Sequence, residues 1–319
     1  MLVTLAGVLF AARADAEPSA SFAVAPPVVS APAGAAVGLA PLTVQGNQIV
    51  RDGQPFHFHG VNRDSLEWGR ASYGGCGGDG HFTDHDFDLI RSWGVTAVRI
   101  AVSQAGWLGR RCPAADYARW VDDAIAKANA RGMYAIVDLH WTDVQGRAPC
   151  DVGCLSGQQP MPDADSLVFW RSVASRYANR PGVIFGLFNE PHDVSWGCWR
   201  NGGCSVLPSA LTLSLSSLLP YKAVGMQQLY DAVRAQGASN LVLVGGLDWA
   251  YDVSGATNGF ALTGSNIAYD THVYTMFHST TADWDAHFGA VAARYPVVST
   301  EFGSADCSTA STARLLSYF

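Results

Sequence analysis

The chain has few charged residues, and this scarcity narrows the range of its partners. Only 15% of its 319 residues are charged, with 20 Lys and Arg against 27 Asp and Glu and a net charge of −7. Because the sequence contains no basic run, we expect neither nucleic acid nor an anionic membrane surface as a partner. A neutral substrate fits this composition better, and we expect a monomer.

Long apolar runs are also scarce. Residues 1–10 form an apolar stretch that is too short to span a bilayer. The segment Ala14-Asp15-Ala16 then supplies the small-x-small pattern of a signal-peptide cleavage site. We therefore predict an export signal over residues 1–16, no transmembrane segment, and a secreted protein that is extracellular or periplasmic.

Residues 17–41 are almost free of charge and consist mainly of Ala, Pro, Ser, Val and Gly. This composition is typical of an extended linker. The folded domain is predicted to cover residues 42–319, because 49% of the chain is apolar and a single large core can form. Within it, Gly-Asn and Asp-Gly pairs predict a small hairpin over residues 45–55.

The seven cysteines fit an exported protein if they pair. The expected disulfides are Cys76 with Cys112, Cys150 with Cys154, and Cys198 with Cys204, which leaves Cys307 over. A zinc site is not predicted, because no matching pair of histidines joins these spacings. A metal site at His57, His59, His81 and His85 is not predicted either, since nothing in the sequence fixes its geometry.

Apolar runs alternate with amphipathic stretches along the folded part of the chain. Strands are predicted at 56–62, 97–102, 134–140, 183–188, 241–247, 267–274 and 297–301. Helices are predicted at 83–94, 114–132, 166–179, 221–235 and 283–294. Alternating strands and helices with right-handed crossovers give a parallel sheet, and at this length the α/β fold that fits best is the (β/α)8 TIM barrel, with the hairpin at its floor.

An eighth strand has no counterpart in the sequence. The chain ends at Phe319, within the helix expected after the seventh strand, so we expect a barrel truncated after strand seven. An open barrel of this kind exposes hydrogen-bonding edges on its first and seventh strands.

Polar residues stand where these strands end. They are Asn62, Arg99, His140, Asn189, Glu190, His272, Tyr274 and Glu301. In α/β barrels the chemistry takes place at the carboxyl ends of the strands. Glu190 ends the fourth strand and Glu301 the seventh, so the two carboxylates are predicted to face each other across the barrel mouth. Cleavage of a glycosidic bond needs such a pair.

The motifs around these residues resemble those of glycoside hydrolase family 5, the family of many cellulases. The motifs are Gly60-Val61-Asn62, Val98-Arg99-Ile100, Asp138-Leu139-His140, Phe188-Asn189-Glu190-Pro191, Thr271-His272-Val273-Tyr274 and Thr300-Glu301-Phe302-Gly303. The resemblance covers about residues 42–304. It implies a retaining barrel glycosidase that needs neither a cofactor nor a metal ion.

The resemblance also implies the roles of individual residues. Glu190 would be the general acid and base, and Glu301 the nucleophile. Asn189 would bind the 2-hydroxyl group of the sugar, a contact that strengthens in the transition state.

Four further residues would support the two carboxylates. Arg99 and the Tyr274 hydroxyl would favour the ionised form of Glu301, while His140 and His272 would orient the sugar and the carboxylates. The alternative is structural: a buried ion pair for Arg99, satisfied core histidines, and strand packing for Tyr274.

Aromatic residues are frequent in the stretches that follow the strands. They are Trp68, Tyr73, Trp107, Trp141, Trp196, Trp199, Trp249 and Tyr251. Flat aromatic faces stack on pyranose rings, so several are expected to line a groove. Trp141 and Trp249, which stand next to strand ends, are the predicted substrate-binding residues, although loop packing is the alternative for any single one.

Together these features predict a secreted endo-β-glycosidase that hydrolyses a β-1,4-glucan such as cellulose. A β-mannanase or a β-1,3-glucanase with the same site is the nearest alternative, because the motifs contact only the scissile sugar. A polysaccharide-binding barrel without turnover is the alternative from another class, because the expected truncation removes a strand and the sugar-binding tryptophan that the family resemblance implies at its end.

Overall fold

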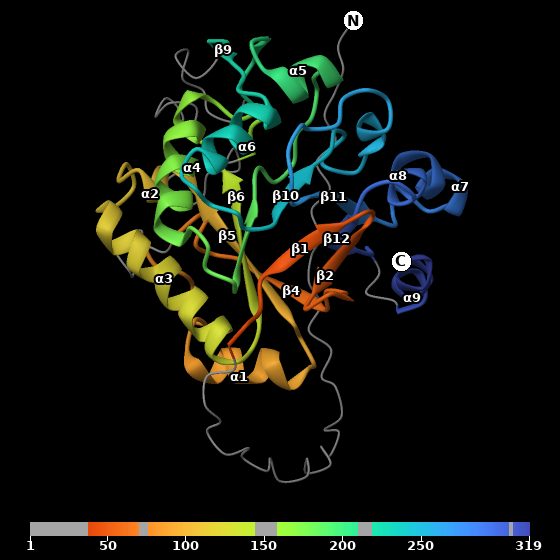
Figure 1. Cartoon of the computed structure of the whole chain (residues 1–319). Coiled ribbons are helices and arrows are strands. Elements are labelled where there is room, and N and C mark those ends of the chain that lie inside the picture. Colours follow the sequence, from red (N-terminus) through yellow and green to blue (C-terminus); the bar gives the residue numbers. More distant parts are fainter. Residues whose placement is uncertain (1–37, 70–75, 144–157, 210–218, 306–308) are drawn as a thin grey trace, which may run out of the picture. The chain divides into compact units, whose positions relative to one another are not determined.

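A seven-stranded parallel sheet forms the centre of the computed structural model, which describes residues 38–69, 76–143, 158–209, 219–305 and 309–319 (Figure 1). The strand order is β12-β11-β10-β7-β6-β5-β4, and every neighbouring pair is parallel. The strands are β4 (Gly60–Arg63), β5 (Ala97–Ser103), β6 (Tyr134–Trp141), β7 (Val183–Gly186), β10 (Val242–Gly245), β11 (Ile267–Tyr274) and β12 (Val297–Gly303).

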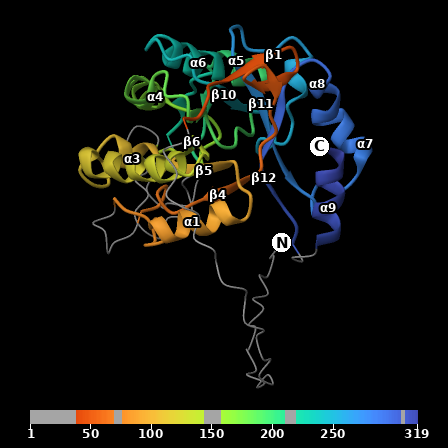
Figure 2. The same cartoon turned by 60° about the horizontal axis from the view of Figure 1, so that its bottom comes forward.

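Helices connect the strands and cover the outside of the sheet. They are α1 (Asp84–Ser92), α2 (Gln104–Trp107), α3 (Ala114–Ala130), α4 (Ala164–Tyr177), α5 (Trp196–Asn201), α6 (Met226–Arg234), α7 (Thr281–Trp284), α8 (Ala290–Ala292) and α9 (Thr309–Tyr318). Figure 2 shows α1, α3, α4 and α6 following one another around the sheet. The predicted α/β barrel is therefore confirmed, with seven parallel strands.

The barrel is nearly closed. Its edge strands, β4 and β12, are joined by a side chain, because Asn62 Nδ2 donates a hydrogen bond of 2.9 Å to the carbonyl oxygen of Thr300. A cavity of about 610 Å³ lies along this seam and is lined from both sides, by Val61 and Phe302 among others. The first and seventh predicted strands are β4 and β12, and they form the two edges of the sheet as expected.

An antiparallel hairpin closes the floor of the barrel. It consists of β1 (Leu42–Gln45), β2 (Gln48–Arg51) and the short β3 (Gln54–Pro55), so the predicted hairpin has a third strand. Leu42 and Ile49 are buried in one cluster with Ala97 and Tyr134, the first residues of β5 and β6. The apolar face of the hairpin therefore covers the amino-terminal ends of the parallel strands.

Three predicted elements differ from the structure. The first parallel strand begins at Gly60 rather than residue 56, because the Phe56 ring packs edge-on against Tyr134 at the floor. The helix predicted from residue 221 begins at Met226, because Tyr221–Lys222 pairs with Ser205–Val206 as the ribbon β8-β9.

The third difference is the helix predicted over residues 283–294. It is divided into α7, a π-helical turn over Asp285–Gly289, and α8. The helix predicted over residues 83–94 agrees with α1, which starts with a capping box between Thr83 and Asp86.

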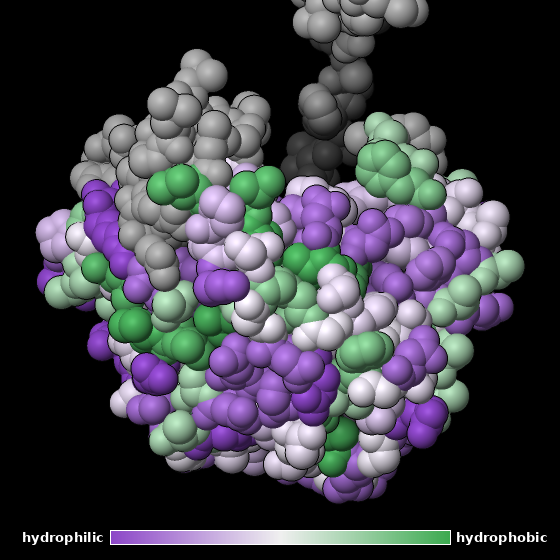
Figure 3. All heavy atoms as spheres, turned by 90° about the horizontal axis from the view of Figure 1, so that it is seen from above, coloured by the Kyte–Doolittle hydropathy of each residue, from purple (hydrophilic) through white to green (hydrophobic). Residues whose placement is uncertain are grey.

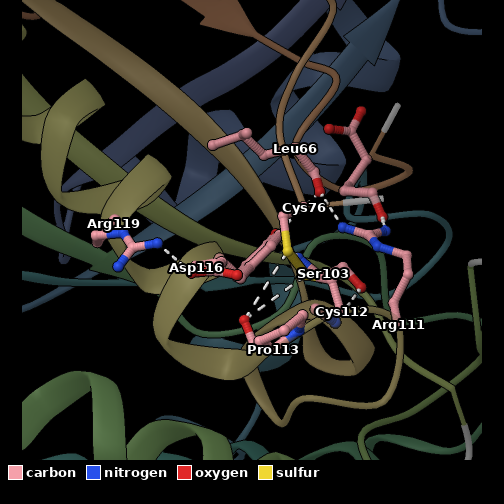
Figure 4. Close-up of a disulfide and its surroundings, with 11 residues drawn as sticks. Leu66, Cys76, Ser103, Arg111, Cys112, Pro113, Asp116 and Arg119 are labelled. Carbon is pink, nitrogen blue, oxygen red and sulfur yellow. Dashed lines mark hydrogen bonds and ion pairs between the residues drawn. A yellow bond between two sulfur atoms is a disulfide. The ribbon is translucent and has the colours of Figure 1, made fainter. Parts of the chain in front are cut away.

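Two of the predicted disulfides are present. Cys76 is bonded to Cys112 (Figure 4), and Cys198 is bonded to Cys204. The other predicted pair, Cys150 with Cys154, and the remaining Cys307 lie outside the described residues. So do the predicted signal at 1–16 and the predicted linker as far as residue 37.

The floor cluster makes a testable contribution to stability. Ile49→Ala removes buried methyl groups where the hairpin meets the strands, so the free energy of unfolding should fall by about 2 to 4 kcal/mol. Thr43→Ala, on the exposed side of the same hairpin, should change it by less than about 0.5 kcal/mol. Urea denaturation of both variants measures the difference, and equal stabilities would mean that the hairpin does not seal the floor.

Candidate active site

A buried arginine holds together the side chains at the carboxyl ends of four strands. Arg99, on β5, is 3% exposed. Its Nη1 donates to Glu301 Oε1 at 2.7 Å and to Asn62 Oδ1 at 3.1 Å. Its Nη2 lies 2.8 Å from Asp138 Oδ2 and also donates to Asn189 Oδ1. Burial alone would lower the pKa of Arg99, but Asp138 and Glu301 raise it, so the guanidinium stays charged.

Glu301 is surrounded by groups that favour its ionised form. The Tyr274 hydroxyl donates a hydrogen bond of 2.9 Å to its Oε2 atom. Burial raises the pKa of Glu301, but His272 and Arg99 outweigh burial and hold the pKa of this carboxyl well below its usual range. Glu301 is therefore a carboxylate at neutral pH.

Glu190 has different partners. His272 Nδ1 lies 2.9 Å from Glu190 Oε1, and Gln158 Nε2 donates to Glu190 Oε2 at 3.1 Å. The Gln158 carbonyl oxygen accepts a hydrogen bond of 3.1 Å from Asn189 Nδ2. The Gln158 side chain thus holds both Asn189 and Glu190. The sequence does not point to Gln158, because this residue stands in a loop without a periodic pattern.

His272 links the two carboxylates. Its Nδ1 is 2.9 Å from Glu190 and 3.8 Å from Glu301 Oε2, while its Nε2 is 3.6 Å from Asp270 Oδ2. Burial lowers the pKa of His272, but Glu301, Asp270 and Glu190 together raise it to about 10. Asp270 is a second site residue that sequence reasoning missed, since it lies within β11 rather than at its end.

The two carboxylates lie close together. Ligand atoms of Glu190, His272 and Glu301 all fall within 4.8 Å of one another. Such a group could hold a metal ion, but here the acidic oxygens are already matched by the charges of Arg99 and His272. The two carboxyl groups therefore lie close enough to act on the same bond of a bound molecule.

His140 lies beside this group at the end of β6. Its Nδ1 is 2.8 Å from Asp138 Oδ2, and its side chain is partly exposed. Burial lowers the pKa of His140, but Asp138 more than compensates, so the net direction is upward. The structure thus brings together seven of the nine predicted site residues: Arg99, His140, Asn189, Glu190, His272, Tyr274 and Glu301.

The two predicted tryptophans lie at strand ends and are partly accessible. Trp141 ends β6, and its ring centroid is 6.0 Å from that of Trp68. Trp249 is 46% exposed and stacks on His192, with 3.6 Å between ring centroids. It stands in a turn in which Asp248, Trp249 and Ala250 all have positive φ. This strained turn is tied to the loop after β7, because the Trp249 amide donates to the Pro191 carbonyl oxygen.

The other candidate aromatics divide. Trp107, Trp199 and Tyr251 are buried and belong to the core, so for these three the alternative of packing applies. Trp196 packs against Trp199, and Tyr73 lies outside the described residues. Sequence alone does not separate these cases, because a loop aromatic that folds inward has no distinctive spacing.

The profile of the cellulase family, glycosyl hydrolase family 5, matches residues 50–318. The chain belongs to this family. Among curated relatives, endoglucanase Z of Dickeya dadantii is 28% identical to this chain over 242 residues, which make up 75% of this chain and 46% of that protein. Endoglucanase MaCel5A of Microbulbifer sp. is 26% identical over 273 residues, 82% of this chain and 44% of that protein. The chain therefore spans about half the length of these relatives.

Solved structures share the fold of this family 5 chain. The β-glucanase SdGluc5_26A of Saccharophagus degradans, in complex with cellotetraose, has a TM-score of 0.65 at 24% identity, with 89% of this chain and 83% of that chain covered. The catalytic domain of Thermobifida fusca endoglucanase Cel5A has a TM-score of 0.62 at 19% identity, with 87% and 80% covered.

Figure 3 shows hydrophilic and hydrophobic residues intermixed on the face seen from above. No helix within the described ranges is both long and apolar enough to cross a bilayer.

The charge on His272 should make stability depend on pH. Its pKa rises from an ordinary 6.5 to about 10 on folding, so its contribution is complete below pH 6.5 and is lost as pH rises through 10. Between pH 6.5 and 10 the wild type should therefore lose roughly 2 to 4 kcal/mol more unfolding free energy than His272→Gln.

Chemical denaturation at several pH values measures this difference. His57→Gln, which replaces an exposed histidine, is the matched control and should behave as the wild type does. If His272→Gln loses as much stability as the wild type, His272 is not held as an imidazolium by the two glutamates.

Proposed function

We propose that this family 5 chain is a retaining endo-β-glycosidase that hydrolyses β-1,4-glucan. The observation that carries the proposal is the separation of the two carboxylates, since oxygens of Glu190 and Glu301 lie within 4.8 Å of each other. Retaining glycosidases have carboxyl groups about 5 Å apart, whereas inverting enzymes leave room for a water molecule between them.

In the first step, Glu301 attacks the anomeric carbon of the sugar. The glycosidic C–O bond breaks, and the leaving oxygen takes a proton from Glu190, so that a covalent glycosyl ester on Glu301 remains. In the second step, Glu190 accepts a proton from a water molecule, whose oxygen attacks the anomeric carbon and releases Glu301. Arg99 and Tyr274 stabilise the carboxylate before attack and after release.

The neighbouring residues orient the two carboxylates and the sugar. His272 and Gln158 hold the two oxygens of Glu190, which aims the acid at the leaving group. Asn189, which Arg99 and Gln158 hold by hydrogen bonds, binds the 2-hydroxyl group in this proposal. His140, which contacts Asp138, binds a further hydroxyl group.

A glucan substrate is supported by the relatives and by the aromatic residues. The two curated relatives are named endoglucanases, and a structural neighbour was solved with cellotetraose. Trp249 offers one accessible ring face while His192 covers the other. Trp141, with Trp68 beside it, offers a second apolar surface.

Two alternatives follow from what these contacts leave open. A β-mannanase or a β-1,3-glucanase would use the same two glutamates, since linkage is recognised further along the groove. A polysaccharide-binding barrel without turnover is the other candidate. Product analysis on cellulose, mannan and β-1,3-glucan distinguishes these functions. Each enzyme releases sugar from its own polysaccharide, whereas the binding barrel releases sugar from none.

Secretion is part of the proposal. The bonds Cys76–Cys112 and Cys198–Cys204 fit an oxidising compartment. We propose that residues 1–16 are an export signal, that residues 17–41 are a linker and that the catalytic domain starts at residue 42.

The first product should retain the anomeric configuration of the substrate. Glu301 and Glu190 are too close for a water molecule to attack directly, so two successive displacements are expected. Proton NMR of a cello-oligosaccharide digest, recorded before mutarotation, measures the first anomer formed. An initial α-anomer would rule out Glu301 as the nucleophile.

Glu190→Gln and Glu301→Gln should each lower kcat by about 10³-fold or more, because each removes a group that acts on the reacting bond. Both variants keep the side-chain shape, so circular dichroism should match the wild type. An activated aryl glycoside needs little protonation of its leaving group, so it should be cleaved faster than the polymer by Glu190→Gln but not by Glu301→Gln. Near-wild-type turnover in either variant contradicts its assigned role.

A further inference from the structure

An irregularity in the sheet stands directly before Glu301. Asp270 of β11 pairs with Val298 of β12. The pairing then shifts and resumes with His272 opposite Glu301, so that one residue separates the two pairs on β11 and two residues separate them on β12. Strand β12 therefore carries one extra residue, which makes a β-bulge, and bulges of this kind are common next to active sites.

The bulge turns two consecutive side chains toward the same neighbour. Side chains of a regular strand alternate between the two faces of the sheet. Here, however, Thr300 Oγ1 lies 3.2 Å from His272 Nε2, and Glu301 Oε2 lies 3.8 Å from His272 Nδ1. Without the extra residue, the register would place Thr300 opposite His272 and would turn Glu301 to the other face of the sheet.

Asp270 holds the bulged residue in place. Its side chain is buried on β11. Its Oδ1 accepts a hydrogen bond of 3.0 Å from the Thr300 N–H, and its Oδ2 accepts one of 2.6 Å from the Thr300 hydroxyl. From β4, Asn62 Nδ2 donates to the Thr300 carbonyl oxygen. A bulge disrupts the ladder locally, and here side chains of the two neighbouring strands bond to the backbone of the bulged residue.

The Thr300 hydroxyl also orients His272. A hydroxyl group has one hydrogen to donate, and Thr300 donates it to Asp270. The hydroxyl oxygen therefore accepts from His272 Nε2, which must carry a hydrogen. The other ring nitrogen, Nδ1, faces Glu190. Through Thr300, Asp270 thus acts on the histidine that lies between the two glutamates.

We propose that Asp270 is a positioning residue for Glu301, because its carboxyl group fixes the bulge at Thr300 that turns Glu301 into the barrel mouth. This role rests on the proposed hydrolase function, in which Glu301 is the nucleophile. It predicts an effect on kcat rather than KM, since the proposed sugar contacts come from other strands and loops.

The first experiment measures kcat and KM for cellotetraose in wild type, Asp270→Ala and Asp270→Asn. A displaced nucleophile slows the reaction, so Asp270→Ala should lower kcat by about 100-fold with KM nearly unchanged. Asp270→Asn keeps an oxygen that accepts the Thr300 N–H, so it should recover about tenfold of that loss. An Asp270→Ala variant with the kcat of the wild type overturns the proposal, and so does an Asp270→Asn variant that recovers nothing.

Asp86→Ala is the matched control. Asp86 accepts the N–H and the hydroxyl of Thr83 at 3.0 and 2.6 Å, the same two contacts that Asp270 makes with Thr300, but at the start of α1. Loss of this cap should lower stability and leave kcat as in the wild type. An equal loss of kcat in Asp86→Ala would mean that Asp270 acts only through stability.

Thr300→Val separates the bulge from the hydroxyl group. Valine keeps the backbone N–H that bonds to Asp270, so this variant should lose less kcat than Asp270→Ala. An equal loss would assign the effect to the hydroxyl contact with His272 and would overturn a role for the bulge.

Crystal structures of wild type and Asp270→Ala test the inference without catalysis. Glu301 Oε1 should keep its hydrogen bond of 2.7 Å to Arg99 Nη1 in the wild type and lose it in the variant. If the wild type hydrolyses nothing, the proposed function fails, and this comparison still decides the role of Asp270. An unmoved Glu301 would overturn that role.

Amide hydrogen exchange covers the case in which Asp270→Ala does not fold. In the wild type the Thr300 amide should be protected by its bond to Asp270. In Asp270→Asn this protection should persist, while kcat falls less than in a variant that lacks the acceptor. Exchange of the wild-type Thr300 amide at the rate of an unfolded chain would overturn the proposal.

Discussion

The buried guanidinium of Arg99 is the interaction on which the rest of the site depends. It joins Glu301 on β12, Asp138 on β6, Asn62 on β4 and Asn189 after β7. A buried arginine is tolerated only when acceptors surround it. These contacts therefore fix the ends of the strands relative to one another, and they include both sides of the seam between β4 and β12.

Two cations lie among the acidic side chains of the site. Arg99 and protonated His272 stand beside Glu301 and Glu190, while Asp138 and Asp270 support the two cations from behind. Glu301 is thereby kept ionised, whereas Glu190 bonds mainly to His272 and Gln158. The two glutamates therefore have different surroundings, and the different roles proposed for them rest on this difference.

Much of the fold, and the meeting of Glu190 and Glu301 at one end of the barrel, could be predicted from the sequence, because strand periodicity locates the strand ends near which both residues stand. The contribution of Gln158 could not be predicted, since it comes from a loop whose course no repeating pattern gives. The helix expected from residue 221 failed because the pairing of β8 with β9 overrides local helix propensity. Buried Trp107 and exposed Trp249 look alike in sequence, as tertiary packing alone separates them.

The central claim is that Glu301 carries a covalent glycosyl intermediate. Reaction with a 2-deoxy-2-fluoro β-cellobioside that has a good leaving group slows the second step more than the first, so the intermediate accumulates. Peptide mass spectrometry should find one fluorosugar on the peptide containing Glu301, and none in Glu301→Gln. A label on another residue, or turnover of the natural substrate with no trapped ester, would contradict the account.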